Sequence, residues 1–484
     1  MHAELSPCAR RSVAYIAFLL CRRTLSRLPA TAGGAVLLGM ILSVMAGCTP
    51  LTIRDARDSP DHLVPGTIPA LKEYFEGASQ RVVIVLVHGV GDHCPTYGLD
   101  AKIGWLSDAT TSVLGLNPDG PVGTPEPISD PDNRTENGTV DPGSAFYLTR
   151  RQYSYQQTNG RRTDVEVGEI TWSGVTAWIK AKQLSFDLTD AAAAGDTSVS
   201  HAPATLSCPE IPAGPYPFSR QVLNKSIKEP VLDLSLSDAM LYVGPYGVKI
   251  EHGVAEMLCR LLSDKSYDSK QQCQWSDVSD TATSSRFLFM THSLGSRIVY
   301  DTLIDLAGEA PTRAGKSVFD DKEAAVKVQK IIANTSAVYM FANQLPLLGL
   351  ANVPVTLRSG DPPNNYLQIE NLPDRTLKKA CLRDSIACLA TLKGTSAAAL
   401  GENPGRLDIV AFSDPNDLLS WPIPQWYLKD TDTLNLQITN VTLQNAFHWF
   451  GLLEWPESAH DNYMSNSTVW SVIRCGATNG KPAC

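Results

Sequence analysis

Near-continuous apolar runs mark the strands of a buried sheet. Residues 81–87 read Arg-Val-Val-Ile-Val-Leu-Val, and residues 286–290 and 337–342 are similar runs of aliphatic and aromatic side chains. Runs of this kind, without the alternation of a half-exposed strand, are typical of strands that helices cover on both faces. Residues 406–413 and 436–441 predict two further strands. The pattern therefore predicts an α/β fold.

The long stretch between the first two of these strands has periodicity only in places. Residues 164–172 alternate between polar and apolar positions and predict a strand, and the apolar positions between 248 and 262 fall on one face of a helix. Polar stretches rich in proline and glycine surround these segments. We therefore expect an insertion at about 100–245 that covers the top of the sheet, and a second irregular insertion at about 354–405.

A candidate nucleophile follows the strand at 286–290. Residues 291–295 read Thr-His-Ser-Leu-Gly and lead into a helix-like segment. A strand, a sharp turn with small residues two before and two after a serine, and a helix make a nucleophile elbow, which exposes the serine oxygen. Thr291 replaces the usual glycine, so the motif departs slightly from the pattern. Ser293 is the expected nucleophile, and the alternative is an elbow that is only a structural turn.

The strand at 81–87 runs directly into His88-Gly89-Val90. An apolar strand that ends in His-Gly is where an α/β-hydrolase supplies one N–H group of its oxyanion hole, and the residue after the serine supplies the other. We expect these donors at Val90, or at Gly89, and at Leu294. The neighbouring His292 is expected to pack and to form hydrogen bonds at the elbow.

A serine hydroxyl needs a base within hydrogen-bond reach, and the base needs a carboxylate. His460, followed by Asp-Asn and a helix-like segment, is the expected base, while His448 lies among aromatic residues and is its rival. Asp417, followed by two leucines and then prolines, is the expected acid, and Asp414, directly after a strand, is the alternative. The order Ser293, Asp417, His460 is the Ser, Asp, His order of α/β-hydrolases.

On these motifs, over roughly residues 81–473, the chain resembles the α/β-hydrolase superfamily, specifically its lipase and esterase branch. It is also similar to uncharacterised bacterial hydrolase-fold lipoproteins, in residues 86–89, 170–173, 291–296 and 340–346. The resemblance implies a mostly parallel central sheet with helices on both faces and large insertions. It also implies a serine hydrolase that cleaves a carboxylic ester through an acyl-enzyme on Ser293. A fold-level likeness does not identify the substrate.

Two other functions stay open: an acyltransferase that uses the same triad, and a non-catalytic envelope lipoprotein that keeps the fold as a binding scaffold. The expected substrate is an ester or a lipid, and the expected chemistry needs no cofactor. A metal site is not expected, although His88, Asp92, His93 and Cys94 could be imagined as ligands. The apolar run at 345–350 is expected in the core, with an acyl pocket as the alternative.

The N-terminus has the features of an export signal. Arginines precede the apolar residues 35–45, and Ala-Gly-Cys48 follows. A cysteine at this place resembles the bacterial lipobox, so residues 1–48 are expected to be a signal peptide, with lipid on Cys48. Residues 1–21 look surplus to the signal, which suggests a later start codon. An uncleaved anchor is the alternative, but the run is shorter than the ~20 residues of a comfortable span.

Residues 49–80 are expected to be a tether and lead-in to a hydrolase domain at 81–484. Thr49 stands where many inner-membrane lipoproteins have aspartate, so an outer-membrane lipoprotein facing the periplasm or the cell surface is expected. A lipid anchor in a membrane is thus the one expected partner besides substrate, and no protein partner is indicated. The net charge of −9, without a long basic run, argues against nucleic acid as a partner class.

Eight of the eleven cysteines lie after Cys48, and an even number in an exported protein predicts disulfides. Three pairs are close in the sequence, namely Cys259 with Cys273, Cys381 with Cys388, and Cys475 with Cys484, which leaves Cys94 with Cys208. A zinc site is the competing interpretation, but no C-x-x-C or clustered Cys/His spacing supports it.

Overall fold

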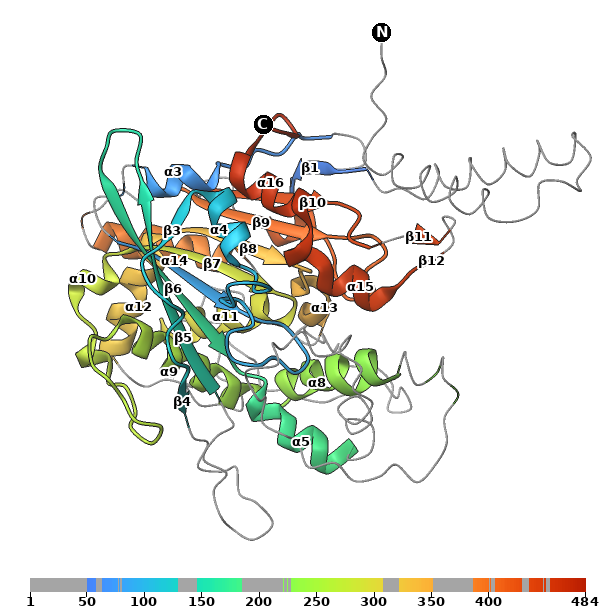
Figure 1. Cartoon of the computed structure of the whole chain (residues 1–484), viewed down its shortest axis with the longest axis horizontal. Helices are drawn as coiled ribbons and strands as arrows, with labels where there is room; N and C mark the ends of the chain where they lie inside the picture. The colour runs from blue at the N-terminus through green and yellow to red at the C-terminus, as the bar shows by residue number, and fades with distance from the viewer. Residues whose placement is uncertain are drawn as a thin grey trace, which may run out of the picture.

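A ten-stranded mixed sheet with helices packed against it forms the centre of the molecule (Figure 1). The α/β class predicted from the sequence is therefore confirmed. The structure is a computed structural model, and the residues that it describes are 50–57, 63–76, 78, 81–128, 146–184, 221, 224, 228–307, 322–350, 386–399, 401, 405–428, 435–446, 448–449 and 453–484.

The strands lie in the order β1-β10-β9-β8-β7-β2-β6-β5-β3, and β4 pairs with β5. Adjacent strands from β6 to β10 along this order are parallel, whereas β1, β3, β4 and β5 pair antiparallel with their neighbours. The bounds are β1 Thr52–Asp55, β2 Val82–Val87, β3 Leu116–Pro118, β4 Glu126–Ile128, β5 Phe146–Gln156, β6 Arg162–Thr171, β7 Arg286–His292, β8 Thr335–Phe341, β9 Leu407–Ser413 and β10 Leu436–Thr442.

Helices cover both faces of the sheet, and the two faces have separate apolar cores. Side chains that alternate along β2, β7, β8 and β9 point to one core or the other, so these strands are buried on both sides. One face is covered by α9 Gly247–Leu262, α11 Leu294–Leu306, α12 Lys322–Asn334 and α14 Ala387–Ala399; the other by α3 Leu71–Phe75, α4 Asp108–Leu114 and α16 Ser467–Cys475. This two-sided burial explains the near-continuous apolar runs.

The remaining elements are short. The helical elements are α5 Gly174–Leu184, η2 Lys228–Leu236, α8 Ser237–Val243, η3 Trp275–Asp277, α10 Asp280–Thr283, α13 Leu345–Gly349, η6 Gln425–Leu428, α15 Pro456–Asp461 and η7 Asn462–Ser465. Two small hairpins pair β11 His448–Trp449 with β12 Leu453–Glu454, and β13 Ala477–Thr478 with β14 Lys481–Pro482. In α13, Leu345 and Leu348 join the core, as expected, whereas Leu350 beyond its end is 68% exposed.

Two regions contribute more to the sheet than the sequence suggests. The expected tether at 49–80 contains β1, which pairs with β10, and the helix α3. The expected insertion at about 100–245 contains β3 to β6, so part of it widens the sheet instead of covering its top. Residues 354–385 of the second expected insertion lie outside the described residues, and α14 after them packs on α12.

Disulfides close two of the predicted pairs. Cys259 is bonded to Cys273 at the end of α9, and Cys475 is bonded to Cys484 at the C-terminus. Cys94 and Cys388 are also in disulfides. Their expected partners, Cys208 and Cys381, lie outside the described residues.

Candidate active site

Ser293 occupies the turn between β7 and α11 with an unusual backbone conformation. Its φ is 53° and its ψ is −123°, a region that a residue with a side chain rarely adopts and that costs about 1–3 kcal/mol. The chain passes so tightly here that a Cβ on Gly295 would overlap the His88 carbonyl, and one on Gly89 would lie 2.5 Å from the Ser293 Cβ. Both positions therefore require glycine.

Thr291, the departure from the usual motif, has a local explanation. Its hydroxyl lies 2.9 Å from the Ser296 hydroxyl and donates to the Tyr339 carbonyl at 3.1 Å. Both hydroxyls are buried, and the hydrogen bond between them gives each a polar partner within the turn. Threonine therefore joins β7, β8 and α11 by polar contacts where glycine would leave a gap.

The three residues predicted as a triad are in contact. The Ser293 Oγ lies 2.9 Å from His460 Nε2, and His460 Nδ1 lies 2.9 and 3.0 Å from the two carboxylate oxygens of Asp417. Ser293 comes from the turn after β7, Asp417 from the loop after β9, and His460 from α15. All three side chains are buried, so their interactions are little weakened by water.

The electrostatics of the pair suit a base held by a carboxylate. Burial alone lowers the pKa of His460, but Asp417 outweighs this effect and raises the pKa above its usual value. Burial raises the pKa of Asp417, but His460 and hydrogen bonds, including the Leu419 N–H at 2.9 Å, bring the pKa below its usual value. The Tyr463 hydroxyl also donates to Asp417, at 3.3 Å. Asp417 thus stays ionised and stabilises a protonated His460.

Asp414, the alternative acid, makes no hydrogen bond to His460 in the described structure. Asp414 accepts hydrogen bonds from the Asn416 N–H at 2.8 Å and the Asn445 N–H at 2.5 Å instead. His448 lies in β11, outside the residues whose side chains the structure describes. The contacts therefore favour Asp417 over Asp414 as the partner of His460.

Asp414 is part of a buried carboxyl pair with Glu454. The Asn416 side-chain amide donates to both residues, at 3.3 Å and 2.8 Å, and the Ala446 N–H donates to Glu454 at 2.5 Å. Burial and the adjacent Asp414 raise the pKa of Glu454 to about 8. A protonated Glu454 can donate a hydrogen bond to Asp414, so at neutral pH the pair carries one negative charge. The pair joins the loop after β9 that carries Asp414 and Asp417, the acid loop, to the segment before α15.

We predict that Glu454→Gln makes the protein more resistant to alkaline pH. The folded-state pKa of Glu454 lies above the ordinary 4.5, so its contribution to stability is complete below about pH 4.5 and is lost as pH rises to about 8. Glutamine keeps a neutral donor at every pH. The difference in melting temperature, variant minus wild type, should therefore increase between pH 5 and 8 and stay constant at higher pH. A pH-independent difference between the two melting curves would contradict the shared proton.

The loop of residues 88–93 lies beside the serine. His88 is fully buried between the rings of His93 and Trp172, with ring centroids 4.2 and 4.9 Å away. Its Nε2 accepts the Trp172 N–H at 2.9 Å, which fixes the proton on Nδ1, and Nδ1 donates to the Gly89 carbonyl at 2.8 Å. Within the described part of the chain, neither the Val90 N–H nor the Leu294 N–H donates a hydrogen bond. Both predicted donors are therefore free for a substrate oxygen.

His292 has the packing role expected from the sequence. Burial, with a further effect of His460, lowers its pKa to about 3, so the ring is neutral. Its Nε2 lies 3.0 Å from the His460 carbonyl oxygen and donates to it. His292 therefore holds the backbone of the base in place.

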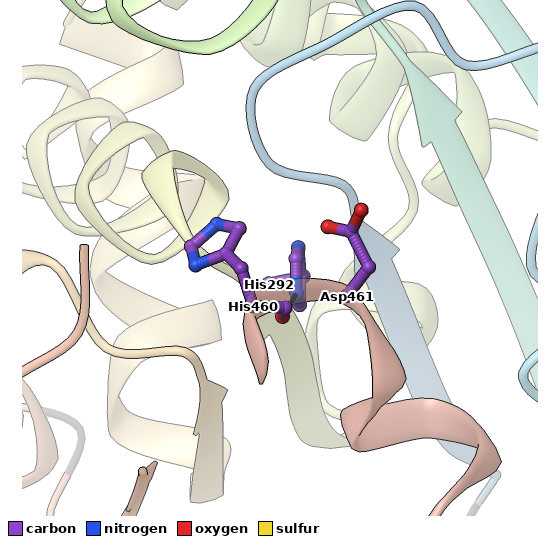
Figure 2. A group of neighbouring side chains, drawn as sticks. All are labelled: His292, His460 and Asp461. Atoms are coloured by element: carbon purple, nitrogen blue, oxygen red, sulfur yellow. Dashed lines mark hydrogen bonds between the residues drawn. The ribbon is translucent and has the colours of Figure 1, made fainter. Parts of the chain in front are cut away.

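His292, His460 and Asp461 also form a group whose ligand atoms could approach one metal ion. Figure 2 shows the His460 ring on the opposite side of His292 from the Asp461 carboxylate. Both ring nitrogens of His460 already contact Ser293 or Asp417. A metal ion bound by His460 would have to displace one of these contacts, so the geometry supports the triad over a metal centre.

Sequence reasoning missed several residues that support the site. Glu169 lies in β6, and its carboxylate accepts hydrogen bonds from three backbone N–H groups at 2.5 to 3.0 Å, those of Thr96, Gly98 and Leu99. These bonds fix the segment that follows the 88–93 loop. Tyr463 follows His460 by about one helical turn, a spacing that could have suggested a shared contact. No pattern in the sequence around Glu454 indicates its contact with Asp414.

Comparisons with models of protein families, with curated proteins and with solved structures found no match to this chain. The described geometry provides a hydroxyl in contact with an imidazole, a carboxylate behind the imidazole, and two nearby N–H groups. Such an arrangement can remove a proton from the hydroxyl and stabilise an anionic oxygen.

Proposed function

We propose that the protein is a serine hydrolase that cleaves a carboxylic ester through an acyl-enzyme on Ser293. The observation that carries the proposal is the continuous contact from the Ser293 Oγ through His460 to Asp417. The strained φ of Ser293 supports it, because strain of this kind is typical of active sites. A non-catalytic scaffold would have no need of either feature.

In the proposed mechanism, His460 Nε2 takes the proton of Ser293 as Oγ attacks the ester carbonyl carbon. The carbonyl oxygen becomes anionic and accepts the N–H groups of Val90 and Leu294, each worth roughly 3 kcal/mol of barrier. The protonated His460 then gives its proton to the leaving alcohol, and the acyl-enzyme forms. Water, deprotonated by His460, attacks the acyl carbon, and the proton returns to Ser293 as the acid is released.

The topology supports an α/β-hydrolase fold for this chemistry. The 88–93 loop follows β2, which is paired with β7, the strand that ends at the serine. The acid follows β9, and the base follows the neighbouring strand β10. Adjacent parallel strands bring their carboxyl ends to one edge of the sheet, where active sites of open α/β sheets form.

The substrate that we propose is an ester, and lipid esters belong to this class. Leu418 follows Asp417 directly and is 58% exposed, and Trp421 of the same loop is 38% exposed. They give the loop that carries Asp417 two exposed apolar side chains, which an ester with an apolar acyl group could contact. No described contact favours an acceptor other than water, so acyl transfer stays a second possibility without an observation of its own.

We also propose that the protein is an outer-membrane lipoprotein with lipid on Cys48. Within the described ranges, no helix combines the length and the apolar character needed to cross a bilayer. Cys48 itself lies outside the described residues, so support comes from the sequence and from the disulfides, which fit an oxidising compartment. Mass spectrometry of the mature N-terminus would check this location.

The experiment that tests the proposed activity is labelling with a fluorophosphonate probe. We expect the purified full chain to hydrolyse a short p-nitrophenyl ester and to lose this activity when the probe modifies Ser293, located by peptide mass spectrometry. Absence of both labelling and hydrolysis would refute the proposal. Labelling of a different serine would move the nucleophile away from the predicted turn.

A further inference from the structure

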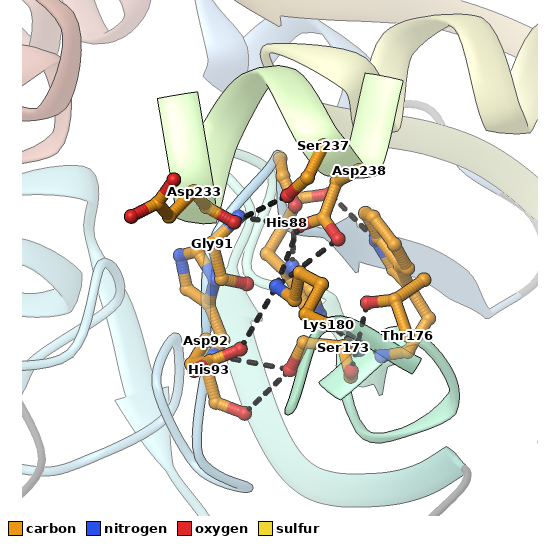
Figure 3. A network of polar contacts seen from close by, with 12 residues as sticks. His88, Gly91, Asp92, His93, Ser173, Thr176, Lys180, Asp233, Ser237 and Asp238 are labelled. Atoms are coloured by element: carbon orange, nitrogen blue, oxygen red, sulfur yellow. Dashed lines mark hydrogen bonds and ion pairs between the residues drawn. The ribbon is translucent and has the colours of Figure 1, made fainter. Parts of the chain in front are cut away.

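The 88–93 loop is held by residues from two helices far along the chain, α5 and α8. The Gly91 N–H donates to Asp238 Oδ2 at 2.8 Å, and Asp238 belongs to α8. Lys180 of α5 lies with its Nζ 3.1 Å from Asp92 Oδ1 and 3.1 Å from Asp238 Oδ1. Figure 3 shows Asp238 and Lys180 reaching the loop from their two helices. The loop therefore depends on the region between β6 and α9.

These charges are buried with their partners. The side chains of Lys180 and Asp238 are 1% and 0% exposed. Burial lowers the pKa of Lys180, but Asp238 and Asp92 outweigh it and raise the pKa, so the ammonium stays charged. A buried carboxylate without a cation would be strongly destabilising. Burial raises the pKa of Asp238, and Lys180 acts against this effect, so the ion pair with Lys180 favours the anionic form that accepts the Gly91 N–H.

Other contacts fix the two ends of the same loop. The Ser173 hydroxyl accepts the His93 N–H and donates to the His93 carbonyl, both at 3.0 Å, and the Trp172 indole donates to the His88 carbonyl at 3.0 Å. The middle is different, because Gly91 has a φ of +92° and glycine has the widest choice of backbone conformations. The steric limits of Gly91 therefore do not fix the peptide bond between Val90 and Gly91. Its position depends on the hydrogen bond from the Gly91 N–H to Asp238.

We infer that Asp238 is a positioning residue for the oxyanion hole: through the Gly91 N–H it holds the Val90 N–H where the anionic oxygen of the tetrahedral intermediate develops. The inference rests on the proposed function. It makes α8 part of the catalytic unit, because Asp238 would act through the Gly91 N–H and not on the substrate itself. Loss of the Asp238 contact leaves Ser293, His460 and Asp417 intact but misplaces one donor.

The test compares Asp238→Ala and Asp238→Asn with wild type in the full chain. We measure kcat per fluorophosphonate-titrated serine, KM for p-nitrophenyl butyrate, and Ki for a trifluoromethyl ketone, which forms a tetrahedral adduct with an anionic oxygen. For Asp238→Ala we expect kcat to fall about tenfold to hundredfold, KM to change less than about threefold, and Ki to rise in proportion to the loss of kcat/KM. Asparagine keeps an acceptor oxygen, so we expect its losses to be about threefold to fivefold.

Asp408→Asn is the matched control. Asp408 is a buried carboxylate near the start of β9, at the opposite end of that strand from the acid loop, and it accepts the Tyr74 hydroxyl at 2.9 Å. This variant should lose stability but keep kcat per titrated serine and Ki within about twofold.

Two results would overturn the inference. Values of kcat per titrated serine and Ki within about twofold of wild type for Asp238→Ala would show that Asp238 only stabilises the fold. If the alanine variant does not fold, an unchanged Ki for Asp238→Asn has the same meaning. A wild-type protein that neither hydrolyses the ester nor binds the ketone would refute the proposed function itself, which separates that failure from the first.

Discussion

Replacing Ser293 or His460 by alanine is expected to lower kcat for ester hydrolysis at least about a thousandfold. The Ser293 Oγ and His460 Nε2 are 2.9 Å apart, so each variant removes one side of the same proton transfer. The double variant should be little worse than either single variant, because the residues act as a unit. Steady-state kinetics with a p-nitrophenyl ester, at protein concentrations matched by circular dichroism, would measure these losses.

Two controls separate chemistry from folding. Ser296→Ala removes a hydroxyl from α11 that bonds Thr291 and not His460, and should keep most of the activity. His252→Ala changes an exposed histidine of α9 and should have almost no effect. Full activity in Ser293→Ala would end the serine-hydrolase proposal, and full activity in His460→Ala would return His448 as the candidate base.

Asp417→Asn is expected to lower kcat by about two to four orders of magnitude, and Asp414→Asn far less. An amide at position 417 would present a donor to His460 Nδ1 as readily as an acceptor, and would favour the tautomer with its proton on Nε2. That tautomer cannot accept the Ser293 proton. Asp414 has no such effect, because its oxygens accept the N–H groups of Asn416 and Asn445.

The two aspartate variants control for each other, since both side chains are buried and both belong to the loop after β9. Asp414→Asn should therefore affect the melting temperature more than turnover. If two well-folded variants gave the opposite order, with Asp414→Asn the less active, the acid role would pass to Asp414.

The sequence predicts the parallel centre of the sheet because burial on both faces leaves a strong local signal. Residues 82–87 are buried at every position and must be apolar, whichever helices cover them. β5 was not predicted, because Arg150, Arg151 and Gln152 in its middle interrupt any apolar run. Arg150 forms ion pairs with Glu126 and Glu166, so its place in a strand depends on partners from other segments.

The contact among Ser293, His460 and Asp417 was predictable for a similar reason. The turn at Ser293 requires Gly295 locally, and the order of the three residues follows from the order of the strands. Asp238 and Lys180 were not predictable, since they lie in the expected insertion, and their role arises only when α5 and α8 pack beside the 88–93 loop. Glu454 likewise acquires its raised pKa from burial in the folded protein and from Asp414, which lies far away in the sequence.

The pairing of β1 with β10 has a consequence for how freely the molecule could move above a bilayer. β1 begins at Thr52, so only residues 49–51 separate it from Cys48. An extended chain spans at most about 3.3–3.6 Å per residue, which gives a reach of about 14 Å from Cys48 to the sheet edge. If Cys48 carries the lipid, the edge formed by β1 would stay within the headgroup region or just above it. The molecule would then act as a surface-bound body with a restricted range of tilts, and would encounter only those esters that come within a protein diameter of its own membrane.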